Sequence, residues 1–106
     1  MNGGLRLLRH CLVLALLAAR RAGVRRVIFG STSAVYESGS GRVHTEREGT
    51  RPNLVYALTK IAAEDLCRAF VTNYGMDILI ARFFNVYGAH QDAMRKTPPF
   101  TSYLAR

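Results

Sequence analysis

Tyr56 and Lys60 are the residues whose types and spacing most directly suggest chemistry. They lie four positions apart in a segment with helical periodicity, where side chains at i and i+4 are neighbours. A free tyrosine has a pKa of about 10, so a phenol that acts as a base near neutral pH needs its anion stabilised. An ammonium group one turn away supplies part of that stabilisation. The same spacing also occurs in ordinary surface pairs, so the surrounding elements decide between the two interpretations.

Two short apolar runs predict strands, one over residues 24–29 and one over residues 78–81. Each contains consecutive large apolar residues, as expected of parallel strands that are buried on both faces. Helical periodicity predicts a helix over residues 5–22, ahead of the first strand.

The segment between the strands is predicted to contain a long loop and a second helix. Residues 37–53 are rich in turn formers and charged residues and have no apolar period. Asn53 is the expected N-cap of a helix that runs to Tyr74 and is ended by Gly75. Its more polar side carries residues spaced four apart, namely Lys60, Glu64 and Arg68. The order of helix, strand, loop, helix and strand predicts an α/β fold with parallel strands.

The polar segments that follow the two predicted strands are expected to meet at one edge of the sheet. Thr32 and Ser33 follow the first strand, and Phe84 and Asn85 come shortly after the second. The helix that carries Tyr56 begins at the same edge, because it follows the loop leaving the first strand. Ligands of open α/β sheets bind beyond the carboxyl ends of the strands. This convergence favours a functional role for Tyr56.

Composition limits the classes of protein that fit. With 106 residues, the chain is long enough for one small domain or part of a larger one. A hydrophobic content of 49% with 21% charged residues is typical of a folded chain. The net charge of +8 favours anionic partners such as nucleotides, nucleic acids or membrane surfaces. The basic residues are scattered, however, which argues against a nucleic-acid-binding tail.

The cysteines and the longest apolar run exclude further classes. Cys11 and Cys67 are far apart and belong to no metal-ligand or disulfide pattern, so no metal site is predicted and a reducing, cytoplasmic location is expected. Residues 11–19 are too few for a membrane span.

Four segments in order resemble the extended short-chain dehydrogenase/reductase family, in particular its NAD-dependent nucleotide-sugar epimerases and dehydratases. They are residues 18–29, 31–36, 56–60 and 82–88. The resemblance implies a Rossmann-like parallel sheet with flanking helices, a nucleotide-sugar substrate, and isomerase or oxidoreductase chemistry. It implies NAD as the cofactor, with NADP left open, and a homodimer for the full-length enzyme.

The resemblance also implies roles for individual residues. Tyr56 is similar to the catalytic base that takes a proton from a sugar hydroxyl while a hydride passes to the nicotinamide. Lys60 would lower the pKa of the phenol and bind the nicotinamide ribose. Thr32 resembles the Ser/Thr that hydrogen-bonds the reacting hydroxyl, with Ser33 as the second candidate. Phe84 corresponds to a residue that borders the cofactor, and Asn85 to one that contacts the substrate.

The chain also departs from the family pattern. The family begins with a strand, a glycine-rich turn and a helix that holds the pyrophosphate, but Gly3 and Gly4 stand without a preceding strand. We therefore interpret residues 1–106 as a single incomplete Rossmann-type NAD-binding segment, central or C-terminal in its domain, that lacks the glycine-rich βαβ unit. We expect this segment alone to be inactive or nearly so. Ser33 and Ala34 replace an acidic pair common in dehydratases, which favours epimerase-like or reductase-like chemistry.

Two other hypotheses remain open at this point. One is a truncated family member that acts as a non-catalytic binding or interaction module, through unpaired sheet edges and uncovered helix faces. The other is a small basic nucleic-acid binder, whose binding would depend strongly on salt.

Overall fold

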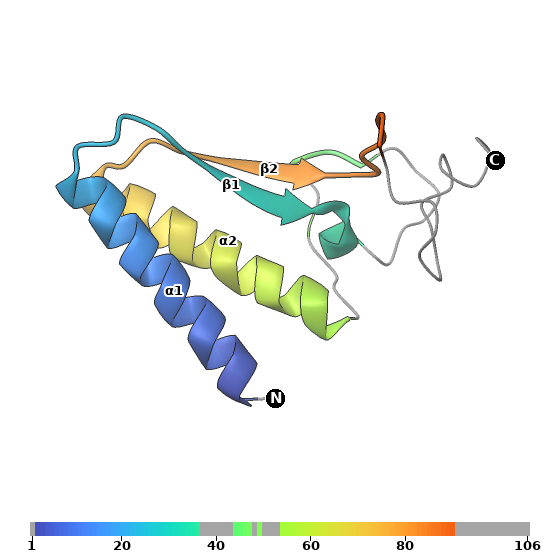
Figure 1. The fold of residues 1–106 in the computed structure, drawn as a ribbon, viewed down its shortest axis with the longest axis horizontal. Helices are drawn as coiled ribbons and strands as arrows, with labels where there is room; N and C mark the ends of the chain where they lie inside the picture. The colour runs from blue at the N-terminus through green and yellow to red at the C-terminus, as the bar shows by residue number, and fades with distance from the viewer. Residues whose placement is uncertain (1, 37–43, 48, 50–53, 91–106) are drawn as a thin grey trace.

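The computed structural model describes residues 2–36, 44–47, 49 and 54–90. In order, its elements are α1 (Asn2–Arg21), β1 (Val27–Thr32), the short 3-10 helix η1 (Ser33–Tyr36), α2 (Val55–Tyr74) and β2 (Ile78–Phe83). Figure 1 shows the two strands side by side with both long helices on one side of them. No helix in these ranges is long and apolar enough to cross a membrane.

The two strands pair in parallel, in the order that the sequence predicts. Their register runs from Val27 opposite Ile78 to Thr32 opposite Phe83. A parallel pair needs a long crossover between its strands, and α2 lies within it. The prediction of an α/β fold with parallel strands and flanking helices is therefore confirmed.

The core forms where both helices meet one face of the sheet. Leu16 of α1 packs with Cys67 and Phe70 of α2, all three buried. Apolar strand residues pack against this cluster, namely Val27, Phe29, Ile78 and Ile80. Side chains alternate between the two faces of a strand, so the cluster uses every second strand residue.

Burial of the strands on both faces was predicted, and that prediction is wrong for the described residues. Ile28 and Leu79 are opposite each other in the register and are both exposed. Phe83 is also exposed, and its ring lies 3.5 Å from the position that a Cβ on Gly30 would occupy. Both helices cover the other face of the sheet, which leaves this one open among the described residues.

The element boundaries differ from the predictions by a few residues. The first helix begins at Asn2 instead of residue 5, and the first strand runs from Val27 through Thr32 instead of over residues 24–29. The second strand continues two residues beyond Ala81, to Phe83. Backbone pairing continues beyond the last residue of each apolar run. The strands therefore extend into the polar segments that follow.

The second helix ends as predicted but begins differently. Its N-cap is Leu54, which forms no capping hydrogen bond with its side chain, and Asn53 lies outside the described residues. Gly75 ends the helix with φ 65° and ψ 25°, and its N–H donates to the Val71 carbonyl over 2.9 Å. This left-handed conformation costs least for a residue without a Cβ. Most of the predicted 37–53 loop is also outside the described residues.

Candidate functional site at the strand ends

The carboxyl ends of the two strands bring the predicted polar segments to one edge. Thr32 ends β1 opposite Phe83, which ends β2, and Phe84 and Asn85 follow directly. Tyr56 is the second residue of α2, whose N-terminal half lies beneath the same end of the sheet in Figure 1.

Lys60 is held against the first strand. Its Nζ donates a hydrogen bond to the carbonyl oxygen of Gly30 over 2.9 Å and lies 5.2 Å from the centre of the Phe29 ring. It is also 5.9 Å from the centre of the Tyr56 ring. The ammonium group therefore contacts the strand backbone and lies near the tyrosine ring, and the i and i+4 spacing accounts for the second of these. Tyr56 itself is 55% exposed, so a ligand can reach its side chain.

The other predicted site residues occupy both strand ends. The Thr32 Oγ1 accepts a hydrogen bond from the Ala34 N–H over 3.2 Å, at the start of η1. Phe84 stacks on Tyr36, with ring centres 6.4 Å apart and planes 23° apart. Asn85 is exposed. The structure thus brings Lys60 to β1 beside Tyr56, whereas Phe84 contacts η1.

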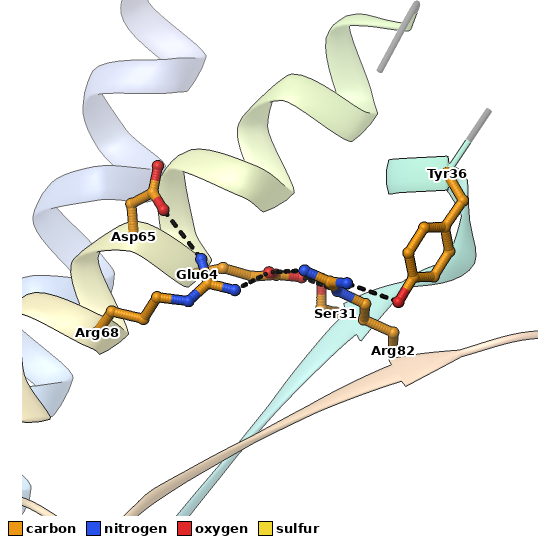
Figure 2. A network of polar contacts seen from close by, with 6 residues as sticks. All are labelled: Ser31, Tyr36, Glu64, Asp65, Arg68 and Arg82. Carbon is orange, nitrogen blue, oxygen red and sulfur yellow. Dashed lines mark hydrogen bonds and ion pairs between the residues drawn. The ribbon is translucent and has the colours of Figure 1, made fainter. Parts of the chain in front are cut away.

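The residue that sequence reasoning missed is Glu64. It was assigned to the polar side of the helix, yet its side chain has no exposed surface. Ser31 donates its hydroxyl hydrogen to Oε1 over 2.5 Å. Arg82 donates from Nε to Oε1 over 3.0 Å and from Nη2 to Oε2 over 2.8 Å. Arg68 adds a contact from Nη2 to Oε2 at 2.9 Å. Figure 2 shows this network.

Two features of the sequence could have identified this network. Glu64 is four residues after Lys60 and eight after Tyr56, so all three share one face of the helix. Arg82 directly follows the four apolar residues that were predicted to form the second buried strand. Because buried charges are almost always paired, these two residues were candidates for an ion pair.

Arg82 extends the network to η1. Its Nη1 donates to the Tyr36 hydroxyl over 2.6 Å, and its guanidinium carbon is 4.9 Å from the centre of that ring. Burial alone would raise the pKa of Glu64, but the hydrogen bonds from Arg82 and Ser31 lower it overall. The hydrogen bond with Glu64 raises the pKa of Arg82. The pair is therefore ionised at neutral pH.

A cavity of about 280 Å³ lies beside this network. Its lining includes Tyr36, His44, Arg82 and Phe84, together with Thr45, Glu46, Arg68, Ile80 and Ala81. Tyr36 and His44 stack within it, with ring centres 4.8 Å apart. Neither Tyr56 nor Lys60 lines this cavity. The residues that line the cavity are therefore different from the predicted proton-transfer residues.

Replacing Glu64 by glutamine is expected to destabilise the fold strongly. The variant leaves Arg82, whose side chain is only 12% exposed, without its anion. Breaking a buried ion pair by removing one partner costs about 3–5 kcal/mol. Arg68→Gln is the matched control, because Arg68 contacts the same oxygen but is 52% exposed, and exposed pairs contribute at most about 1 kcal/mol. Urea unfolding measures both, and equal losses would contradict the assignment.

The stability of the chain should fall in acid partly because of Glu64. The folded-state pKa of Glu64 is lower than its ordinary value of 4.5. Its ionised form therefore stabilises the fold above about pH 4.5, and this contribution is lost as the pH falls through the lower, folded-state pKa. Glu64→Gln should lose less unfolding free energy than the wild type between about pH 6 and about pH 3. Identical losses in urea titrations at both pH values would refute this assignment.

Comparisons with known proteins place this geometry in a family. A model of the NAD dependent epimerase/dehydratase family matches residues 4–106. The uncharacterized UDP-glucose epimerase YtcB of Bacillus subtilis is 38% identical over 74 residues, which cover 70% of this chain and 23% of that protein. The dTDP-D-glucose 4,6-dehydratase of Mus musculus is 36% identical over 87 residues, 82% of this chain and 24% of that protein.

Solved structures give the same result. The UDP-N-acetylglucosamine 4-epimerase of Methanobrevibacter ruminantium matches with a TM-score of 0.79 and 30% identity, over 86% of this chain and 29% of that one. The UDP-glucose 4-epimerase of Thermus thermophilus, solved with NAD, matches with a TM-score of 0.68 and 35% identity, over 76% of this chain and 27% of that one. The chain spans about a quarter of the length of the curated relatives named above. It belongs to the NAD dependent epimerase/dehydratase family.

Proposed function

We propose that this chain is the segment of an NAD-dependent nucleotide-sugar epimerase or dehydratase that carries its proton-transfer residues. The observation that supports this most is the position of Lys60, whose ammonium group is bonded to Gly30 two residues before Thr32 and lies beside the ring of Tyr56. The base Tyr56 and the cation Lys60 on α2 thus lie next to β1, which ends at the hydroxyl donor Thr32. The family membership and the names of the relatives agree with this assignment.

In the proposed reaction these residues act on one sugar hydroxyl. Thr32 donates a hydrogen bond that orients it, and Tyr56 removes its proton as general base. Lys60 stabilises the phenolate and binds the nicotinamide ribose. NAD, when bound, supplies the hydride acceptor. The partly buried cation at Lys60 and the accessible ring of Tyr56 fit this role.

The residues after β2 are assigned to the ligands. Phe84 borders the cofactor and Asn85 contacts the nucleotide-sugar; both are exposed at the strand end. Ser33 and Ala34 in η1 stand where dehydratases commonly carry an acidic pair, which favours epimerase-like or reductase-like chemistry.

The complete activity is proposed for a longer protein. About three quarters of each curated relative lies outside the matched segment. We therefore assign residues 1–106 to one part of a Rossmann-type domain, and NAD binding, the nucleotide-sugar and a homodimeric assembly to the full-length enzyme. By itself this segment is expected to be inactive or nearly so.

A chimera tests the proposed role of Tyr56. Residues 27–88 would replace the matching segment of the Thermus thermophilus UDP-glucose 4-epimerase, and interconversion of UDP-glucose and UDP-galactose would be measured with NAD present. Tyr56→Phe should lower kcat by about 10² to 10⁴-fold, because general base catalysis contributes that much. Tyr74→Phe, on the exposed last residue of the same helix, should leave kcat unchanged.

Each outcome of this experiment has a clear meaning. Equal activity of the Tyr56→Phe and Tyr74→Phe chimeras would refute the assignment of Tyr56. An inactive parent chimera that still binds NAD would favour a second candidate function, a non-catalytic interaction module. One observation supports that candidate: Ile28, Leu79 and Phe83 form an exposed apolar surface on the open face of the sheet, and surfaces of this kind often bind other chains.

A further inference from the structure

Two adjacent residues of β1 hold two successive turns of α2. The Gly30 carbonyl accepts a hydrogen bond from Lys60 Nζ over 2.9 Å, and the Ser31 hydroxyl donates to Glu64 Oε1 over 2.5 Å. Lys60 and Glu64 are four residues apart and therefore share one helix face. The strand thus contacts the helix through polar groups at both turns.

The second strand holds the same carboxylate. Arg82 donates to both oxygens of Glu64, and Arg82 is the register partner of Ser31. One residue from each strand therefore binds the carboxylate from the same level of the sheet, as Figure 2 shows. The next pair in the register is Thr32 with Phe83, which ends the strands. The two strand residues that bind the carboxylate therefore come one position before the strand ends, where the proposed site begins.

Apolar packing does not hold the first turns of α2 in the same way. The buried cluster meets the helix at Cys67 and Phe70, in its C-terminal half. At the other end, Val55, Tyr56 and Leu58 are each about half exposed. Ala57 and Ala63 are buried but each contributes only a methyl group, and α2 also contacts the buried residues of η1. The polar contacts of Lys60 and Glu64 attach this part of the helix to the strands.

We propose that Glu64 is a positioning residue for the Tyr56–Lys60 pair. Its carboxylate fixes the first half of α2 against β1 and β2, so that Lys60 stays bonded to Gly30 and Tyr56 stays at the strand end. Glu64 acts through Lys60 and does not contact the substrate. The consequence for catalysis rests on the proposed function, whereas the structural claim does not.

Two arginines that bind Glu64 allow this proposal to be tested against a matched control. Arg68 and Arg82 reach the same oxygen, Oε2, over 2.9 Å and 2.8 Å. Arg82 comes from β2 and links the helix to the sheet. Arg68 comes from α2 itself, four residues after Glu64, and also binds Asp65 over 2.9 Å. Of these two arginine contacts, only that of Arg82 can fix the position of the helix against the sheet.

The measurement is the hydrogen bond between Lys60 and Gly30 in the labelled chain without NAD. A scalar coupling across this bond, from Lys60 ¹⁵Nζ to the Gly30 carbonyl ¹³C, reports it directly by NMR. We expect the coupling to be lost in Arg82→Gln and reduced in Ser31→Ala. It should be unchanged in Arg68→Gln. A role of Glu64 in overall stability alone would lower the unfolding midpoint but leave the coupling intact in the folded variants.

Several outcomes would overturn the proposal. Folded Arg82→Gln and Ser31→Ala variants that keep the full coupling would do so, as would its loss in Arg68→Gln. If circular dichroism shows that Arg82→Gln does not fold, Ser31→Ala decides, because it removes one hydrogen bond and keeps the ion pair. In the active chimera, Ser31→Ala should lower kcat and leave the KM for UDP-glucose unchanged. The NMR result holds whether or not the chimera is active, so the two proposals fail separately.

Discussion

The buried carboxylate of Glu64 is the constraint on which the arrangement of this chain depends. Moving an ion out of water costs several kcal/mol, and only well-placed donors compensate that cost. Here the donors come from β1 through Ser31, from β2 through Arg82 and from α2 through Arg68. The carboxylate is satisfied only when both strands are in register and the helix lies at one position along them. A single charged group thus links the sheet register to the helix position.

The two halves of α2 are held by different forces, and this division explains where the candidate site lies. Around Cys67 and Phe70 the helix packs into the apolar core. Around Lys60 it meets the strands through polar contacts and leaves Tyr56 accessible. Burial and the negative charge of Glu64 raise the pKa of the Cys67 thiol, so this cysteine stays protonated and packs as an apolar residue. Glu64 lies between these two regions of the helix.

Much of the fold follows from local sequence patterns, whereas the site depends on contacts that no local pattern contains. The apolar runs near residues 24–29 and 78–81 predict the strands because large apolar residues favour burial, and Gly75 predicts the end of α2. The strand ends were less predictable, since pairing continues through small and charged residues. Glu64 was assigned to a polar face because helical spacing alone cannot show which charged residues meet a partner from a strand. The partner Arg82 is eighteen residues away, and only the tertiary structure brings the two together.

If Tyr56 is the general base, its ring must contact the sugar. Intermolecular nuclear Overhauser effects would be measured between tyrosine ring protons and a UDP-hexose, in the NAD-saturated chimera that carries residues 27–88. We expect contacts from the Tyr56 ring to the hexose and none from Tyr74, which is also exposed but ends the same helix. Contacts from Tyr74, or hexose binding that leaves Tyr56 without any contact, would contradict the assignment of the strand ends as the proton-transfer site.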